Sequence, residues 1–287
     1  MKHTTKRIPA LLLALTLLLT VMSGCGSTTP AGATAAPTAA AAEVPAAEDP
    51  AAAPADAPVI EGLTFTEESP LKYATVFRLF RYEGGYTLIR IDNGGDFLVV
   101  PEGAAVPAKM DSSVTVLQQP LDKIYLAATS AMSLFAAVDA LDHIRLTGTR
   151  ESGWYIDAAV EAMQRGDIEF AGKYSEPDYE RLIDEECDLA IESTMIYHTP
   201  KVKEMIEDLG IPVLVDRSSY EQHPLGRTEW IKLYAALVGK DAEAAEFFDQ
   251  QAAIITQLEG FENTGKTVAF FFVNSDGSIV IRKPTDY

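Results

Sequence analysis

The chain contains 287 residues, of which 47% are hydrophobic and 23% are charged. That length and apolar content suffice for one or two hydrophobic cores and exclude a wholly disordered chain. The 42 acidic residues outnumber the 23 Lys and Arg, for a formal net charge of −19, so we expect no binding to nucleic acid. Two cysteines and four histidines are too few for a disulfide framework, a cysteine-rich zinc site or an iron–sulfur cluster, and we predict no metal site.

The amino terminus has the pattern of an export signal. Three cations in the first seven residues precede the apolar run Ile8–Met22, which is shorter than the ~20 residues that a membrane-spanning helix needs. The run ends in Val21-Met22-Ser23-Gly24-Cys25, which resembles a bacterial lipobox, with Met22 in place of the usual Leu, Val or Ile. We therefore predict a lipoprotein signal peptide over residues 1–24 and lipidation of Cys25. The alternative is a cleaved signal with Cys25 merely nearby.

The next segment, residues 25–58, has the composition of a tether. It is built almost entirely from Ala, Pro, Thr, Gly and Ser and contains no aromatic residue, so it cannot bury a core. Two acyl chains on one residue would hold such a tether stably at a membrane. We expect a folded body on the extracytoplasmic face of the cell membrane.

Residues 59–224 are predicted to form a β-meander followed by an α/β lobe. Strands are expected over Ala74–Tyr82, Tyr86–Asp92 and Asp96–Val100, separated by glycine-containing hairpin signals. Short strands then alternate with helices, which predicts a parallel sheet flanked by helices. The expected strands of this lobe are 115–117, 123–127, 143–147, 168–171, 188–191 and 212–215. The expected helices are 131–140, 155–165, 179–186 and 200–209.

Two helices with apolar stripes are predicted over Leu225–Val238 and Ala242–Leu258, with Gly239 ending the first. A strand then follows over Thr267–Val273 and a second over Ser278–Arg282. The first is apolar without alternation, so it needs cover on both faces. We therefore expect residues 266–287 to begin a second lobe of a longer protein. The alternative is a complete chain whose terminal hairpin joins the first sheet or a partner subunit.

The sequence contains none of the common catalytic motifs. It has no nucleophile elbow, phosphate-binding loop, dinucleotide fingerprint or His-Glu-x-x-His helix. A Ser-His-Asp triad would need His143, His198 or His223, none of which lies in a motif. Cys187 is best explained as a buried filler. We therefore predict no catalytic residues and no intrinsic cofactor, while a secreted α/β enzyme using Ser130 and His223 stays an alternative.

Aromatic and cationic residues follow the carboxyl ends of the predicted parallel strands, where open α/β sheets bind ligands. In an acidic chain this grouping indicates a pocket for a flat or anionic ligand. The predicted ligand-binding residues are Ser130, Arg150, Trp154, Tyr155, Lys173, Tyr174, Glu192, Tyr197, Tyr220 and Arg227. Some of them could equally be ordinary rim or core residues.

Two stretches, 187–197 (CDLAIESTMIY) and 219–232 (SYEQHPLGRTEWIK), carry a resemblance. Together with the lipobox and the tether, they are similar to substrate-binding lipoproteins of bacterial ABC importers for iron-siderophore complexes, haem and cobalamin. The resemblance covers about residues 110–287. It implies two α/β lobes joined by a long helix, here residues 225–260, with the ligand held between the lobes.

The resemblance also implies the partners. Family members dock on their permease through an exposed acid on each lobe; this sequence has Lys201 at the matching position, and Glu204, one turn later, is the candidate. Capture without catalysis is implied, because a ferric ion arrives with oxygen ligands supplied by its chelator. We expect a monomeric, membrane-anchored receptor that delivers a ferric-siderophore-type complex to an ABC permease. The sequence is also compatible with cobalamin or haem capture by the same fold, and with a purely structural or adhesive lipoprotein.

Overall fold

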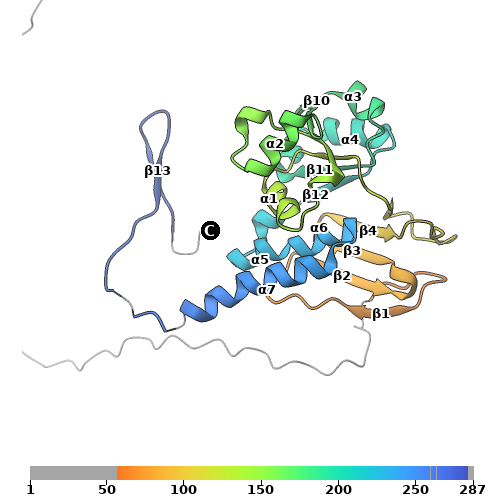
Figure 1. Cartoon of the computed structure of the whole chain (residues 1–287), viewed down its shortest axis with the longest axis horizontal. Coiled ribbons are helices and arrows are strands. Elements are labelled where there is room, and N and C mark those ends of the chain that lie inside the picture. The colour runs from red at the N-terminus through yellow and green to blue at the C-terminus, as the bar shows by residue number, and fades with distance from the viewer. Residues whose placement is uncertain (1–56, 259, 263, 284–287) are drawn as a thin grey trace, which may run out of the picture. The chain divides into compact units, whose positions relative to one another are not determined.

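The computed structural model describes residues 57–258, 260–262 and 264–283 (Figure 1). The predicted signal peptide, Cys25 and the tether up to residue 56 lie outside these residues. The described strands are β1 (Phe65–Glu68), β2 (Phe77–Tyr82), β3 (Thr87–Ile91), β4 (Gly95–Val100), β5 (Val114–Gln118), β6 (Ile124–Leu126), β7 (Ile144–Thr147), β8 (Glu169–Phe170), β9 (Gly172–Lys173), β10 (Glu176–Pro177), β11 (Leu189–Ser193), β12 (Val213–Asp216), β13 (Phe271–Val273) and β14 (Ile279–Ile281). The α-helices are α1 (Thr129–Ala137), α2 (Asp157–Arg165), α3 (Tyr179–Asp184), α4 (Pro200–Asp208), α5 (Pro224–Glu229), α6 (Ile231–Val238) and α7 (Asp241–Leu258), and short 3₁₀ turns connect several elements.

The first sheet has the order β1-β2-β3-β4-β5 and confirms the predicted meander. Strands β1 to β4 pair antiparallel, as hairpins require, whereas β5 runs parallel to β4. Residues 115–117 were expected to open the α/β lobe. They form the fifth strand of the first sheet instead, because Val114–Gln118 pairs along β4 from Asp96 to Val100.

The second sheet has the order β12-β11-β6-β7-β8, and all its strands are parallel. This confirms the predicted α/β fold class with a flanked parallel sheet. The chain runs from β6 outward through β7 to β8 and then returns to β11 on the other side of β6. Strands β6 and β11 therefore form a topological switch point, the usual place for a ligand in an open α/β sheet.

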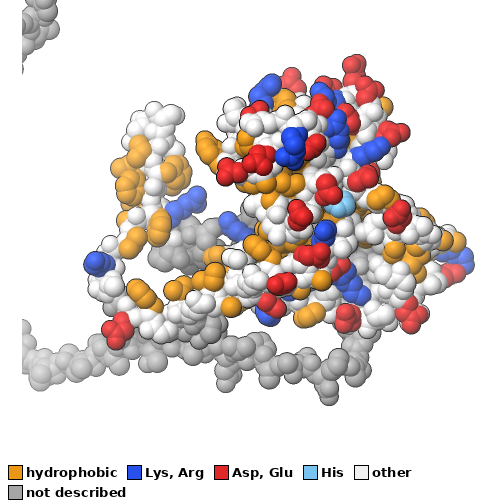
Figure 2. All heavy atoms as spheres, in the orientation of Figure 1, with side chains coloured by type: hydrophobic (Ala, Val, Ile, Leu, Met, Phe, Trp, Pro, Cys, Tyr) orange, Lys and Arg blue, Asp and Glu red, His pale blue; other side chains and the backbone are white. Residues whose placement is uncertain are grey.

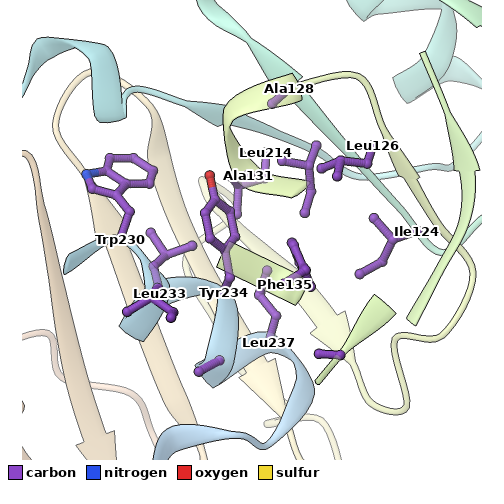
Figure 3. Packing of buried hydrophobic residues seen from close by; sticks show 14 of the residues in the cluster. Ile124, Leu126, Ala128, Ala131, Phe135, Leu214, Trp230, Leu233, Tyr234 and Leu237 are labelled. Atoms are coloured by element: carbon purple, nitrogen blue, oxygen red, sulfur yellow. The ribbon is translucent and has the colours of Figure 1, made fainter. Parts of the chain in front are cut away.

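A shared hydrophobic core joins the two sheets through helix α6. One cluster contains Leu79 and Ile89 from the first sheet, Ile124 from the second, and residues of α1 and α6. Figure 3 shows Tyr234 and Leu237 of α6 beside Phe135 of α1, with the strand residues Ile124 and Leu126 in the same cluster. Six of the eight residues of α6 are buried, so this helix is covered on nearly all sides, as a helix between two sheets must be.

The stretch 225–260, expected as one linking helix, contains three helices. Trp230 separates α5 from α6, and Gly239, with φ of 71°, ends α6 in the left-handed conformation before α7 begins at Asp241. Glycine adopts that conformation at little steric cost. The break predicted at Gly239 is therefore confirmed, and only α7 extends beyond the core.

The terminal hairpin β13–β14 is apolar and exposed. All six of its strand residues are exposed, from Val280 at 38% to Ile281 at 68%, and the space-filling view shows hydrophobic side chains on this hairpin (Figure 2). The strand is shorter than the predicted Thr267–Val273, since pairing begins only at Phe271. In the described part of the chain nothing covers either face.

Candidate functional site

The parallel strands of the second sheet end at one edge, and the loops that follow them form the candidate site. These loops comprise residues 127–128 after β6, 148–156 after β7, 171–178 after β8, 194–199 after β11 and 217–223 after β12. Every predicted ligand-binding residue lies in or beside them except Arg227, which lies in α5 and donates from Nη2 to the Ser219 carbonyl at 3.3 Å. The topology thus brings the predicted residues to one edge.

A hydrogen-bond network ties the loops at the switch point together. The Ser130 hydroxyl, in the first turn of α1, donates to Oδ2 of Asp216 at 2.6 Å, and the Ser218 amide donates to Oδ1 at 2.6 Å. Asp216 ends β12 and is only 4% exposed. Burial, together with the Asp216 carboxylate, raises the pKa of the buried Tyr234 hydroxyl well above its ordinary value. Sequence reasoning missed Asp216, whose only signal is an acid directly after the apolar run 213–215.

Arg217 is the cation best placed to meet an anion in this site. Its guanidinium carbon lies 4.4 Å from the centroid of the Tyr220 ring, and Tyr220 is 55% exposed. No acid lies within ion-pair distance of Arg217 among the described residues, and its Nε is buried without a hydrogen-bond partner there. Stacking on an aromatic ring holds the cation without neutralising it. The β3–β4 turn borders the same side chain, because a Cβ on Gly94 would lie 3.4 Å from Arg217 Cδ.

The β7–α2 loop places its three predicted residues in different environments. Arg150 stacks over Phe170 at 4.2 Å and lines a depression of about 450 Å³. Trp154 is 8% exposed and donates from Nε1 to the Thr149 carbonyl at 3.2 Å. Its ring is therefore buried beneath the loop and bonded to the loop backbone. Tyr155 is 95% exposed. Only Arg150 and Tyr155 therefore present groups at the surface.

The neighbouring loops add further exposed groups. Tyr197, in the 3₁₀ turn after β11, is 44% exposed. Lys173 is exposed and Tyr174 half-buried in the β9–β10 hairpin. Together with Tyr155 and Tyr220, these side chains give the edge an aromatic and cationic surface, as the sequence predicts.

Glu192 was predicted to contact ligand, but the structure buries it completely. Its side chain is 0% exposed, and neither carboxylate oxygen has a hydrogen-bond partner among the described residues. Burial raises the pKa of Glu192 to about 8, because an ionised carboxylate loses its hydration there. Glu192 is therefore mostly protonated at neutral pH and lies beneath the surface of the site.

The stretch 219–232, which carries much of the resemblance, has a structural role here. The buried Glu229 carboxylate accepts from the amides of Lys72, Tyr73 and Ala74 at 2.7–3.0 Å and from Lys232 Nζ at 2.7 Å. Glu221 likewise accepts from the amides of residues 75 and 76 and from Trp230 Nε1. Two carboxylates thus fix the five residues that lead into β2. Sequence reasoning could not see this, since the bonded groups are about 150 positions apart.

Gly226 provides the close packing that this arrangement needs. A Cβ at this position would lie 3.0 Å from the Tyr73 carbonyl oxygen and 3.2 Å from Glu221 Cβ and Oε2. We expect Gly226→Ala to lower the free energy of unfolding by about 1 kcal/mol, because overpacking costs ~1–3 kcal/mol and helix propensity returns at most ~1. Urea unfolding would measure this.

Gly260→Ala is the matched control, since a Cβ there meets no atom within 4 Å. If both alanine variants unfold at the same urea concentration as the parent, the close approach at Gly226 is not a constraint.

The residues that the enzyme alternative would use have other partners in the structure. Ser130 bonds to a carboxylate rather than to a histidine, and His223 accepts at Nδ1 from the Leu225 amide while stacking on Tyr73 at 4.4 Å. These contacts do not form the Ser-His pair that the enzyme alternative requires. No cluster of three metal-ligating side chains occurs within the described ranges. None of the helices in these ranges is long and apolar enough to cross a bilayer.

Comparison with known proteins gives distant matches. No protein-family model matches the chain. An uncharacterized lipoprotein of Methanocaldococcus jannaschii is 24% identical over 63% of this chain and 49% of its own length. Two solved structures are among the matches. A possible iron-binding periplasmic protein of Staphylococcus epidermidis aligns at 17% identity and TM-score 0.44, covering 57% of this chain and 60% of that one. The periplasmic haem-binding protein HutB of Vibrio cholerae aligns at 18% identity and TM-score 0.44, covering 55% and 57%.

The chain spans about half the length of the curated relative and at most 60% of these two solved chains.

Proposed function

We propose that this protein is a lipid-anchored solute receptor that binds an anionic chelate, of the ferric-siderophore type, for delivery to an ABC permease. The observation that carries the proposal is Arg217, a cation without an acid partner among the described residues, stacked on the exposed Tyr220 at the switch-point edge. A chelator supplies the oxygen ligands of its own metal ion. The protein that binds such a complex needs only aromatic side chains, hydrogen-bond donors and positive charge. The exposed tyrosines, Arg150 and Lys173 have that chemistry.

The remaining parts of the proposal concern attachment and delivery. Cys25 would carry the lipid, and residues 25–58 would let the body reach its permease. Glu204, exposed on α4, would pair with a permease cation. The resemblance also covers proteins that bind haem or cobalamin. Titration would distinguish binding of these two ligands from binding of a ferric chelate.

Binding would be tested by titrating the purified chain with a ferric catecholate, a ferric hydroxamate, haem and cobalamin, each followed by calorimetry. We expect saturable binding of an anionic ferric chelate. Saturable binding of only haem or cobalamin would replace the proposed ligand within the same fold. If none of the four binds or raises the melting temperature, the receptor proposal fails, since a ligand at 100 times its Kd adds ~2.7 kcal/mol of stability.

The role of Arg217 would be tested with Arg217→Gln. We expect about tenfold weaker binding of the anionic chelate, which corresponds to ~1.4 kcal/mol, with little change in stability. Arg165→Gln is the matched control, because Arg165 is exposed on α2 and pairs with Asp167 at 2.7 Å. Equal affinities in the two variants would show that Arg217 does not contact the ligand.

A further inference from the structure

Two arginines stack on aromatic rings at opposite ends of the parallel sheet. Arg217 directly follows β12, the first strand in the sheet order, and its guanidinium carbon lies 4.4 Å from the centroid of the Tyr220 ring. The guanidinium carbon of Arg150 lies 4.2 Å from the centroid of the Phe170 ring, and Phe170 ends β8, the last strand in that order. Each cation is therefore held by a ring.

Arg150 resembles Arg217 in having no acid as a partner. Arg150 is exposed, and no carboxylate lies within ion-pair distance of it among the described residues. Glu151 lines the same depression of about 450 Å³, but its Oε1 accepts from Gln164 Nε2 at 2.9 Å. Stacking leaves the N–H donors at the edge of a guanidinium available to an incoming group. Arg150 can therefore bind an anion, as Arg217 can.

The strand order sets the distance between the two cations. The sheet order β12-β11-β6-β7-β8 places four strand spacings between its two ends. Neighbouring strands lie about 4.8 Å apart, so the two ends are separated by roughly 19 Å. The carboxyl ends of the strands are in register, because Asp216 pairs with Ser193 and Phe170 pairs with Thr147. Both cations therefore lie at one edge of the sheet, far apart along it.

The loops between the two cations carry no charged side chain. Residues 127–130 follow β6 and residues 194–199 follow β11, and neither segment contains Asp, Glu, Lys or Arg. The acids near the ends of β11 and β12, Glu192 and Asp216, are 0% and 4% exposed. Tyr197, in the middle of the edge, is 44% exposed. The surface is therefore cationic at both ends and neutral, with an exposed aromatic ring, between them.

We propose that the ligand of this edge carries anionic groups at two ends, one bound by Arg150 and the other by Arg217, with a neutral centre over Tyr197. This inference rests on the proposed function and narrows its substrate class. A chelate with free carboxylates at opposite ends would meet both cations. A compact chelate whose negative charge is concentrated around the metal ion would reach one of them, because the other lies roughly 19 Å away.

The test uses three rigid aromatic carboxylates, each titrated into the full chain by calorimetry. The probe p-terphenyl-4,4″-dicarboxylate has a carboxylate at each end of a long rod, p-terphenyl-4-carboxylate has one, and terephthalate has two that are too close together to reach both arginines. Charge-assisted hydrogen bonds of about 2.8 Å at each end help the long rod to cover the span. We expect the long dicarboxylate to bind about tenfold more tightly than either other probe, because its second contact forms within the bound complex.

Arginine variants identify the two contacts. Arg150→Gln and Arg217→Gln should each weaken binding of the long dicarboxylate about tenfold, to near the affinity of the monocarboxylate. Arg165→Gln is the control, since Arg165 is exposed on α2 and pairs with Asp167, and it should leave the affinity unchanged. Equal melting temperatures of the three variants would separate loss of a contact from loss of the fold. The inference is wrong if the long dicarboxylate has no advantage, or if Arg150→Gln leaves its affinity unchanged.

Failure of this inference differs from failure of the proposed function. If a ferric chelate binds the parent and Arg217→Gln alone weakens that binding, the receptor proposal stands and the two-ended ligand is wrong. If no chelate binds while the long dicarboxylate shows both arginine effects, recognition of two anionic ends stands and the receptor proposal fails.

Discussion

Replacing Glu229 with alanine is expected to lower the free energy of unfolding by about 3–5 kcal/mol, because it leaves buried donors without an acceptor. The amides of residues 72–74 and the Lys232 ammonium all donate to this one carboxylate, which is 0% exposed. Glu229→Gln keeps the shape but replaces one acceptor oxygen with an NH₂ group that faces other donors. We expect it to lose more than half as much stability as the alanine variant.

Urea unfolding of the parent and both variants would measure this effect. Glu161→Ala is the matched control, since Glu161 is an exposed helical glutamate on α2 and should change stability by at most ~0.5 kcal/mol. A Glu229→Ala protein as stable as Glu161→Ala would show that residues 72–74 do not depend on the carboxylate.

Stability is expected to fall as pH rises from about 5 to 8, and Glu192→Gln should remove most of that fall. The pKa of Glu192 is raised from its ordinary 4.5 to about 8 in the folded protein. Between these values the folded state keeps a proton that the unfolded state has lost. The contribution of Glu192 to stability is therefore fully present below pH 4.5 and is lost as pH rises toward 8, by up to ~1.4 kcal/mol per pH unit.

The measurement is urea unfolding of parent and variant at pH 5, 6.5 and 8. The stability difference between them should change by up to about 4 kcal/mol over this range. Glu186→Gln is the control, since the pKa of the exposed Glu186 is lowered by its bond to Lys123. A difference that does not vary with pH would mean that Glu192 titrates normally.

The sequence predicted the strands of the second sheet and helices α1 to α4 to within a few residues. Strands such as β11 and β12 are short apolar runs that end in polar residues, so both their existence and their carboxyl ends could be recognised. Strand β5 was placed in the wrong sheet because its pairing with β4 depends on tertiary contacts rather than on local pattern. Strand β1 was missed because it has no alternating burial to detect.

The sequence predicted which loops form the candidate site. It did not predict the burial and hydrogen bonding of the side chains inside the site. Parallel topology alone brings loop residues such as Tyr155, Tyr197 and Tyr220 to one edge, so a sequence that reveals the strands also reveals the edge. The burial of Glu192 and the interior position of Trp154 depend on how loops fold over the sheet. The roles of Glu221 and Glu229 depend on backbone amides distant in sequence, and a residue pattern does not display backbone donors.

Helix α6 has a consequence for protein engineering. Because one helix supplies core to both sheets, the loops of the parallel sheet cannot be transplanted as an independent module. A graft that carried residues 119–223 alone would leave Phe135 of α1 without Tyr234 of α6, whose ring centroid lies 5.1 Å from that of Phe135. The smallest portable unit is the pair of sheets together with α5, α6 and the segment that Glu229 fastens. A designer who wants a new binding specificity should therefore vary the loops in place.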